Sequence, residues 1–339
     1  MIFAKQSDSA AGMAAAGGPA RTRHHTTRTS DLCEHERVLT GWHQTYDQLS
    51  KGKFSGRITE ALIGDVQLFE EQTSQAVFET GPGRSGVVAL GVFSSLEGEA
   101  RWRGHAVGMD HVTALSDHAS LELCTPPNCT MLSITVPVSL VTTGEEPAVK
   151  DADQLLLNAA NHVHSPSLAL LVRHRLGTAL RTMALHPQQF AQAEARDQLA
   201  SELVGLVDGY LCLATAADGR PDAKKALHVV ARAREYIEAN PERPITVLEL
   251  CARTRTARRT LQDCFTQVTG MSPAAYLKAI RLNGFHRSLK HAAGAGTIAD
   301  IAATWGFWHM SQLSLDYKRL FGELPSETFR AALRWRALQ

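Results

Sequence analysis

Apolar and polar residues alternate with two different periods along the chain, and the change of period divides it. Between residues 40 and 140, short apolar runs are separated by polar residues and by turns such as GPG at 81–83 and TPPN at 125–128. Runs of four to eight residues at this spacing predict β-strands, and the Gly/Pro pairs predict the turns between them. This part of the sequence therefore indicates a small all-β barrel or sandwich.

From about residue 151 the apolar positions recur at helical spacing. Leucines repeat at intervals of three and four residues up to residue 211, which predicts two or three amphipathic helices interrupted at Pro166 and Pro187. The stretch TAADGRPDA at 215–223 has the composition of a linker, and helical patterns continue beyond it. The expected fold class is α+β, with the strands N-terminal and the helices C-terminal.

Two segments near the C-terminus end alike. Leu261, Phe265, Gly270 and Pro273 lie 52 residues before Leu313, Tyr317, Gly322 and Pro325. A short apolar-periodic helix precedes each segment, VLELCA at 247–252 and IADIAATW at 298–305. A short helix, a tight turn and a second helix with one apolar and one polar face form a helix-turn-helix, and the sequence predicts two of them.

The second helix of each unit is expected to present its polar face to DNA, because a major groove admits one α-helix. Leu261, Cys264, Phe265 and Val268 should face inward in the first unit, and Leu313, Tyr317 and Leu320 or Phe321 in the second. Arg bonds guanine and Gln bonds adenine, while Lys and Arg also hold phosphates. The predicted DNA-contacting residues are Arg258, Arg259, Gln262, Asp263, Met310, Ser311, Gln312, Leu315, Lys318 and Arg319.

One long helix is predicted between the units, over PAAYLKAIRLNGFHRSLKHA at 273–292, with Pro273 suited to its first turn. About 18 residues span roughly 27 Å. Successive major-groove faces lie about 34 Å apart, so one chain could present both recognition helices to adjacent turns of a duplex.

Charge is distributed unevenly along the chain. From Arg220 onward there are 19 Lys and Arg against 10 Asp and Glu, whereas the preceding part has 16 against 24. A basic C-terminal part on an acidic body is typical of a nucleic-acid-binding module attached to a sensing or assembly module.

Residues 228–334 resemble the DNA-binding domain of the AraC/XylS family of bacterial transcription regulators, which has two helix-turn-helix units joined by a long helix. The strongest matches are IADIAATWGFWHMSQLSLDYKRLFGELPSE and RTLQDCFTQVTGMSPAAYLKAIRLN. The N-terminal segment WHQTYDQLSKGKFSGRITEALIGDVQLFEEQ is similar to the sensor half of ethanolamine and ornithine utilisation activators. The resemblance implies a transcription regulator, more often an activator than a repressor.

The first unit departs from the family pattern in its turn. Arg255, Thr256 and Ala257 stand where the family usually has Gly, an apolar residue and Ser. Gly would allow a positive φ, and Ser would cap the recognition helix, which is worth about 1 kcal/mol. Either Thr256 caps the helix one residue early, or the first unit is looser. In the second unit Leu315 replaces an Arg common among relatives, so this helix is expected to read fewer base edges.

Cysteine and histidine do not predict a metal centre. The six cysteines are scattered, and the closest pair, Cys124 and Cys129, has no second pair to complete four ligands. Cys33 with His35 and the His24-His25 pair is only a thin indication of a metal site, in the expected disordered tail. His105, His111 and His118 fall in the predicted β region without the paired His-x-His of a metal cupin. Cys251, Cys264, Trp305 and Phe307 are expected in the core, and Trp308 is expected to pack, with contact to the DNA backbone as the alternative.

The sequence-based hypothesis is a cytoplasmic, sequence-specific DNA-binding regulator without enzymatic activity or cofactor. The predicted organisation is a disordered tail at 1–35, a cupin-like β-barrel that senses a ligand at 36–145, a helical connector for dimerisation at 151–215, a linker at 216–227 and the DNA-binding domain at 228–334, with units at 245–269 and 297–321.

The expected partners are double-stranded promoter DNA, an unidentified small-molecule effector, a second copy of the chain and possible contacts with RNA polymerase. No run of about 18 apolar residues predicts a membrane span. The alternatives are a sequence-tolerant architectural DNA binder and an enzyme, such as a metal cupin, joined to a DNA-binding domain. A DNA repair alkyltransferase would be of that second kind, but its reactive cysteine motifs are absent from the sequence.

Overall fold

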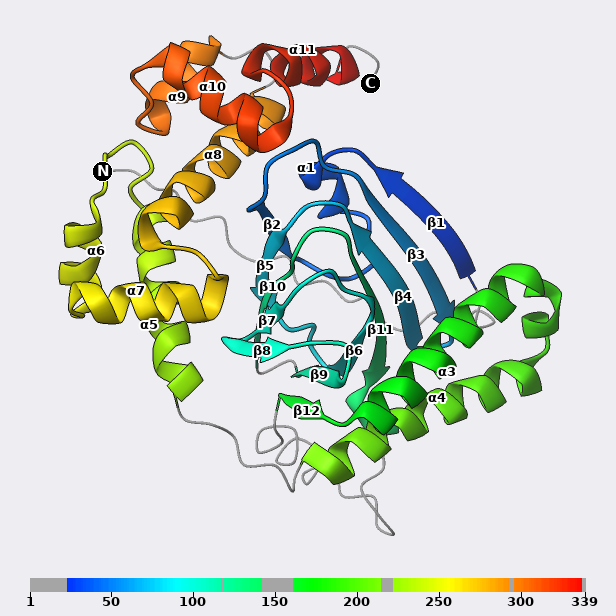
Figure 1. The fold of residues 1–339 in the computed structure, drawn as a ribbon. Coiled ribbons are helices and arrows are strands. Elements are labelled where there is room, and N and C mark those ends of the chain that lie inside the picture. Colours follow the sequence, from blue (N-terminus) through cyan, green and yellow to red (C-terminus); the bar gives the residue numbers. More distant parts are fainter. Residues whose placement is uncertain (1–22, 117–118, 142–160, 215–221, 293–295, 337–339) are drawn as a thin grey trace, which may run out of the picture.

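Two antiparallel β-sheets face each other in the N-terminal half, and helices cover their outer faces (Figure 1). The computed structural model describes residues 23–116, 119–141, 161–214, 222–292 and 296–336. Strands precede a wholly helical C-terminal part, which confirms the predicted α+β class.

The larger sheet has seven strands in the order β1-β3-β4-β11-β6-β9-β12. Its long central strands β4 and β11 pair over seven residues, and valine, leucine and isoleucine dominate their shared surface. The strands are β1 (Arg23–Thr29), β3 (Gly56–Ile63), β4 (Val66–Thr73), β6 (Val87–Ser95), β9 (His111–Ser116), β11 (Cys129–Pro137) and β12 (His162–His164).

The smaller sheet has five strands in the order β2-β5-β10-β7-β8. They are β2 (Thr45–Gln48), β5 (Val77–Pro82), β7 (Ala100–Trp102), β8 (His105–Val107) and β10 (Ser120–Cys124). The described strands have free edges in both sheets, at β1 and β12 and at β2 and β8. The closed cupin-like barrel is therefore not found among the described residues, which form a two-sheet arrangement.

Successive side chains of a strand in the larger sheet point alternately into two cores, one between the sheets and one on the outer face. On β4, Phe69 points into the apolar core between the sheets, whereas Leu68 points to the outer face. Trp42, Trp102 and Phe93 fill the inner core with residues from both sheets. The buried polar residues Gln67 and Glu71 share the inward-facing parity of Phe69.

The N-terminal boundary differs from the expected disordered tail. Residues 23–29 form β1, which pairs with β3 along its whole length, and residues 32–35 form the short helix α1 (Leu32–His35). Leu32, Cys33 and His35 are buried there, because α1 closes the space beside β2 and β5. The prediction of a tail to residue 35 was therefore wrong from residue 23 onward, and residues 1–22 lie outside the described part.

The outer face of the larger sheet is covered by two antiparallel helices, α3 (Pro166–Leu185) and α4 (Ala193–Ala214), joined by the 3-10 turn η2 (Pro187–Ala191). Ser165 caps α3 and Pro166 occupies its first turn, which sets the helix start at the predicted proline. A 3-10 turn, η1 (Val138–Leu140), follows β11.

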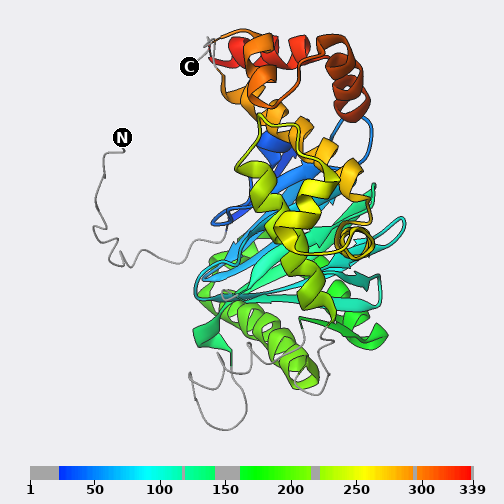
Figure 2. The same ribbon diagram turned by 90° about the vertical axis from the view of Figure 1, so that its left-hand side faces the viewer.

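Seven helices make up the described C-terminal part, and α9, α10 and α11 lie at the end of the molecule opposite α3 and α4 (Figures 1 and 2). They are α5 (Asp222–Glu238), α6 (Val247–Thr254), α7 (Arg258–Thr269), α8 (Pro273–His291), α9 (Ile298–Thr304), α10 (Met310–Phe321) and α11 (Pro325–Arg336).

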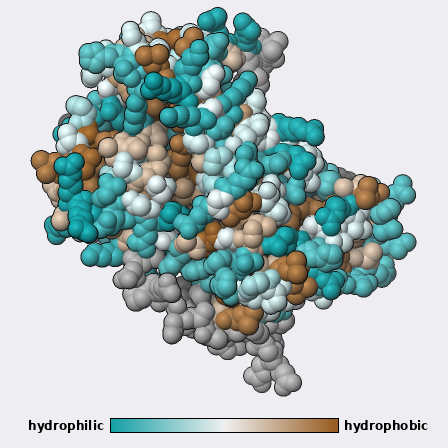
Figure 3. Space-filling view, in the orientation of Figure 1, coloured by the Kyte–Doolittle hydropathy of each residue, from teal (hydrophilic) through white to brown (hydrophobic). Residues whose placement is uncertain are grey.

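The surface seen in Figure 3 is mainly hydrophilic, with hydrophobic residues scattered over it. Within the described residues, no helix combines the length and apolar character needed to cross a membrane.

Candidate nucleic-acid interface

The first helix-turn-helix unit consists of α6 and α7. Thr246 caps α6, and the helix ends at Arg255, whose φ of 54° lies in the left-handed region. An arginine there is strained, because its Cβ crowds the backbone in a way that glycine avoids. Residues 245–270 are all described, and among them no side chain caps α7, which starts after Ala257. Thr256 bonds to Thr254 instead, so the early cap considered from the sequence does not form.

The second unit, α9 and α10, has a more regular start and turn. Thr297 and Asp300 form a reciprocal capping box on α9. Gly306 has a φ of 67°, and a Cβ there would collide with Arg281 and with the carbonyl of Glu242. Arg281 donates to the Trp305 carbonyl oxygen at 3.0 Å, which fixes the turn against α8. Within 296–336, no side chain caps α10, so backbone N–H groups at its start remain for an anion.

The inward faces of both recognition helices are buried. In α7, Phe265 meets Tyr276 of α8 edge-on, with ring centroids 5.2 Å apart. In α10, Tyr317 meets Phe285 of α8 in the same way, at 5.6 Å. Each unit thus rests on one end of α8 through an aromatic pair. The buried inward residues are Leu261, Cys264, Phe265 and Val268 in α7, and Leu313, Tyr317, Leu320 and Phe321 in α10.

The opposite faces carry most of the residues predicted to contact DNA. Met310 differs from the others, because it is only partly exposed and packs against the core of the second unit. Leu315 is 57% exposed, which is unusual for a leucine without a partner surface. The exposed residues of the predicted set are Arg258, Arg259, Gln262, Asp263, Ser311, Gln312, Leu315, Lys318 and Arg319.

Comparisons with known proteins agree with this geometry. A helix-turn-helix domain family matches residues 250–331. The XylDLEGF operon transcriptional activator of Pseudomonas putida is 23% identical over 299 residues, which cover 82% of this chain and 86% of that protein. A probable thc operon regulatory protein of Rhodococcus erythropolis is 34% identical over 111 residues, which cover 32% of this chain and only 33% of that protein.

The chain belongs to the AraC/XylS family of transcription regulators. It is a DNA-binding transcription regulator. Among solved structures, a probable AraC family regulator from Rhodopseudomonas palustris is 38% identical, covering 31% of this chain and 96% of that chain with a TM-score of 0.28.

In this AraC/XylS regulator the carboxyl end of each recognition helix is bonded to the β-sheet part. Near the end of α7, the Gln267 carbonyl accepts from Arg101 at 3.2 Å and the Thr269 carbonyl accepts from the Cys124 thiol at 3.3 Å. At the end of α10, the Leu320 carbonyl accepts from the Gln48 side-chain amide at 2.5 Å and from the Gly52 N–H at 3.0 Å. Both recognition helices are therefore positioned by the β-sheet part as well as by α8.

Helix α8 itself docks on β2 through buried polar groups. The Asn283 amide pairs with the backbone of Gln48, accepting from its N–H at 2.9 Å and donating to its carbonyl at 3.0 Å. The buried carboxylate of Asp47 pairs with Arg287 at 2.8 Å and with Arg234 at 3.1 Å. Burial acts to lower the pKa of Arg287, but Asp47 together with Glu36 raises this pKa overall, so the guanidinium stays charged.

These docking residues were missed from the sequence, because their partners lie more than 180 positions away along the chain. A usable pattern exists on α8, where Asn283, His286, Arg287 and Lys290 recur at intervals of three and four residues. Such a polar stripe on a helix already packed on its apolar side indicates a second, polar neighbour.

Trp308 and Gln312 refine the second recognition surface. Trp308 is 70% exposed, so the packing predicted for it was wrong, and it adjoins the start of α10. The Gln312 amide donates to Asp316 at 3.0 Å, and Asp316 also pairs with Lys278 at 2.7 Å. This bridge holds Gln312 in place and leaves its carbonyl oxygen for a partner.

The predicted core cysteines are buried, and the described histidines of the β region lie close to one another. Cys251 and Cys264 are buried and free of disulfides. His111 stacks on His162 with ring centroids 6.1 Å apart, and the His105 ring lies tilted against His162 at 4.5 Å, whereas His118 lies outside the described residues. Within the described part, these histidines do not bring three potential ligand atoms together.

Proposed function

We propose that this regulator is a ligand-controlled, sequence-specific activator that reads two adjacent major-groove segments with one chain. The carrying observation is the placement of α7 and α10 on the two ends of α8, with their polar faces exposed. The 19 residues of α8 give a helix of about 28 Å, close to the roughly 34 Å between successive groove faces.

The base contacts are assigned to α7 and the phosphate contacts mainly to α10. Arg258, Arg259, Gln262 and Asp263 offer donors and acceptors suited to base edges. Ser311 and Gln312 add polar contacts near the start of α10, while Lys318 and Arg319 hold phosphate. Leu315, which is apolar, suits a thymine methyl group or a shape contact.

Competition binding on the full chain tests this assignment. Operator DNA and random DNA are compared at several salt concentrations. A sequence-specific regulator binds the operator about 10³-fold or more tightly at physiological salt. Equal affinity for every sequence, with only a steep dependence on salt, would support the architectural alternative instead.

Ligand control is proposed for the space between the two sheets. The inner core is apolar, and two buried polar atoms in it have no hydrogen-bonding partner among the described residues, Nε1 of Trp102 and Oγ1 of Thr135. Buried donors of this kind are normally satisfied, so they are suited to an acceptor on a small effector with an apolar body. The cupin-like interior predicted from the sequence thus remains the proposed effector site.

A Trp102→Phe variant tests the effector site without touching the DNA surface. The variant removes the indole N–H and is expected to lose the effector-dependent change in promoter activity while keeping operator binding in the absence of effector. Phe93→Leu is the matched control, because Phe93 lies in the same core but offers no donor. An unchanged effector response in Trp102→Phe would exclude this site.

Dimerisation is proposed through the outer surface of α3. Leu170 is 63% exposed and Leu171 is 44% exposed beside it, and Leu213 of α4 is exposed as well. Leu170→Glu is expected to convert a dimer into monomers in sedimentation, with Lys51→Glu, an exposed residue outside α3 and α4, as the control. Activation through contact with RNA polymerase and a cytoplasmic location complete the proposal, in keeping with the activators that this chain resembles.

A further inference from the structure

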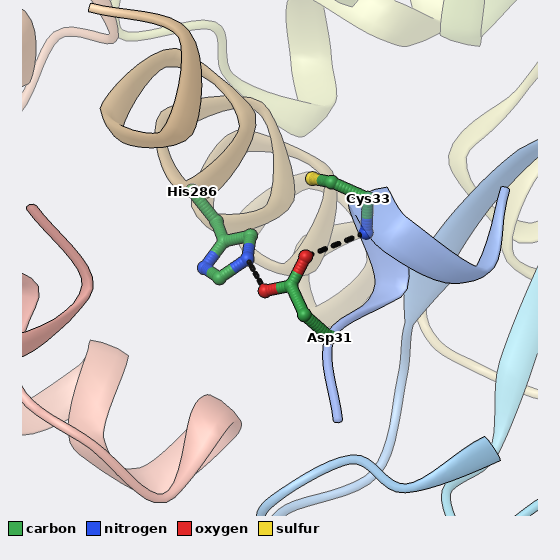
Figure 4. A group of neighbouring side chains, drawn as sticks. All are labelled: Asp31, Cys33 and His286. Atoms are coloured by element: carbon green, nitrogen blue, oxygen red, sulfur yellow. Dashed lines mark hydrogen bonds and ion pairs between the residues drawn. The ribbon is translucent and has the colours of Figure 1, made fainter. Parts of the chain in front are cut away.

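Three side chains with metal-binding chemistry meet at the junction of the sensor and DNA-binding parts. Asp31 and Cys33 lie at the start of α1, and His286 lies on α8, 255 residues after Asp31. Figure 4 shows the Asp31 carboxylate next to the His286 ring, with the Cys33 side chain adjoining. One carboxylate oxygen, the thiol sulfur and one imidazole nitrogen all lie within 4.8 Å of one another.

Carboxylate, thiolate and imidazole form a ligand set typical of zinc. Tetrahedral bonds of about 2.0–2.3 Å would place the three ligand atoms about 3.3–3.8 Å apart. The three ligand atoms would therefore have to move only slightly closer together to reach coordination geometry. Each ligand atom is drawn from a side chain that is mostly buried, Cys33 at 5% and His286 at 5% exposure.

The groups behind these ligands hold two of them in a fixed orientation. Oδ1 of Asp31 accepts from the backbone N–H groups of Cys33 and Glu34 at 2.9 and 3.3 Å, which turns Oδ2 toward His286. Nδ1 of His286 lies 2.6 Å from the Tyr317 hydroxyl, so Nε2 is the nitrogen that faces Asp31, at 2.8 Å. Hydrogen bonds of this kind orient ligands in protein metal sites.

A small cavity adjoins Asp31 and His286. It has a volume of about 20 Å³ and is also bordered by Glu323, which follows α10. This volume suffices for one water molecule. A fourth ligand, either a water or the Glu323 carboxylate, could therefore approach from this side.

We propose that Asp31, Cys33 and His286 bind one divalent transition-metal ion of the zinc type and so join the sensor part to the DNA-binding part. Cys33 binds as the thiolate and passes its proton to solvent when the ion enters, and His286 binds through the unprotonated Nε2 of its neutral ring, whose proton is then on Nδ1 and faces the Tyr317 hydroxyl. The site includes His286 and, through Tyr317, touches recognition helix α10. Metal occupancy would thus restrain the second helix-turn-helix unit relative to the sensor.

Without an ion, the same carboxylate is neutralised by neighbouring cations. Nζ of Lys290 lies 3.4 Å from Oδ2 of Asp31 and 3.7 Å from Glu34. An ion-pair junction of Asp31, His286 and Lys290 has no need of the Cys33 sulfur, whereas the metal site does. The thiol therefore distinguishes the two roles, and the metal proposal does not depend on the proposed DNA-binding specificity.

Cobalt(II) titration of the reduced, chelator-treated full chain tests the site. We expect one tightly bound ion per chain, with the near-ultraviolet charge-transfer absorption of a thiolate ligand and the visible bands of a tetrahedral ion, all removed by one equivalent of zinc. Cys33→Ser should abolish the charge-transfer absorption and weaken cobalt binding by at least about 100-fold. Tyr317→Phe, which keeps every ligand, should weaken it by about 10-fold.

Cys264→Ser is the matched control, because Cys264 is another buried free thiol, on α7. Asp31→Asn provides a second ligand variant that keeps the helix cap. Circular dichroism establishes that each variant is folded. The proposal is overturned if the unmutated chain shows no thiolate absorption, or if a folded Cys33→Ser, Asp31→Asn or His286→Gln variant retains the spectrum of the unmutated chain.

Discussion

The two helix-turn-helix units share a geometry but differ in how their turns and exposed faces are built. The second unit turns at Gly306, which adopts its positive φ without strain, whereas the first turns at Arg255 with the same sign of φ. The exposed face of α7 starts with two arginines, whereas that of α10 has Leu315 in its middle.

The turn of the second unit is therefore the less strained of the two, whereas the first unit has more groups that can read bases. The second unit has a capping box on α9 and turns at Gly306, so its turn is held without strain, while its exposed face offers fewer base-reading groups. The first unit has a strained turn but a richer set of donors on α7. In the described part of the chain, the recognition helices of both units lack a side-chain cap and are bonded to the β-sheet part near their carboxyl ends. We therefore expect the first unit to contribute more to sequence choice and the second more to register.

The largest effect is expected at the hydrogen bonds between the β-sheet part and α10. Gln48→Ala removes the donor to the carbonyls of Ser50, Gly52 and Leu320. The carbonyls of Ser50 and Gly52 lose this donor, at a cost of about 1–3 kcal/mol each, whereas the Leu320 carbonyl keeps the Gly52 N–H, so a loss of about 3 kcal/mol is expected. Hydrogen exchange should accelerate in α10 and α11 but not in α6 and α7. Lys51→Ala, an exposed neighbour, is the control, and equal acceleration in both units would contradict a selective tether.

Removal of one arginine from the first unit should weaken operator binding next most strongly. Arg259→Ala is expected to cost about 1–3 kcal/mol, roughly 5–150-fold in affinity, and to relax the choice of one base pair. Gln262→Ala should act in the same direction. Leu315→Ala in the second unit should change affinity by less than about threefold. Fluorescence anisotropy with operator DNA measures all three, and equal losses in Arg259→Ala and Leu315→Ala would remove the proposed division of roles.

The first turn should be easy to improve, because its sequence is suboptimal. Ala257→Ser supplies a cap to α7 and should stabilise the protein by about 1 kcal/mol. Arg255→Gly should relieve about 1 kcal/mol of left-handed strain. Thermal unfolding measures both changes. Gly306→Ala is the corresponding change in the second unit and should destabilise the protein, because a Cβ there meets Arg281 and the Glu242 carbonyl. An unchanged stability of Gly306→Ala would argue against the difference between the two turns.

The smallest effect is expected for a phosphate contact. Lys318→Ala should weaken binding to operator and random DNA alike and reduce the dependence of log affinity on log salt by about one. Binding isotherms at several salt concentrations measure this slope. A change confined to the operator would show that Lys318 reads bases.

The recognition helices could be located from sequence, because their boundaries depend on local residues. Contacts between residues far apart in the chain could not be predicted in this way. Two residue types mark helix boundaries through backbone conformation alone and can be read from sequence. The glycines Gly270 and Gly322 follow the last residues of α7 and α10, and the prolines Pro273 and Pro325 begin α8 and α11. Helical periodicity predicts which faces of α7 and α10 are exposed. Met310 is the exception, because it was expected on the exposed face and instead packs partly against the core of the second unit.

Contacts across the sheets and between the two parts had no comparable pattern. Residues 23–29 are polar, and only their pairing with β3 makes them a strand. Asp47 with Arg287, and Asp31 with His286, are joined across more than 230 residues by the fold. Cys33 was considered as a metal ligand with its neighbour His35, yet His35 bonds to Glu71 at 2.9 Å, and the histidine beside Asp31 and Cys33 is His286.

The most direct test of the account is a guanine methylation-interference footprint of the full chain on its operator. We expect interference in two major-groove segments about 10 base pairs apart on one face of the duplex, with Arg259→Ala losing the contacts in one segment only. Interference confined to a single groove, or an unchanged pattern in Arg259→Ala, would contradict the assignment of two reading helices and of α7 as the principal reader.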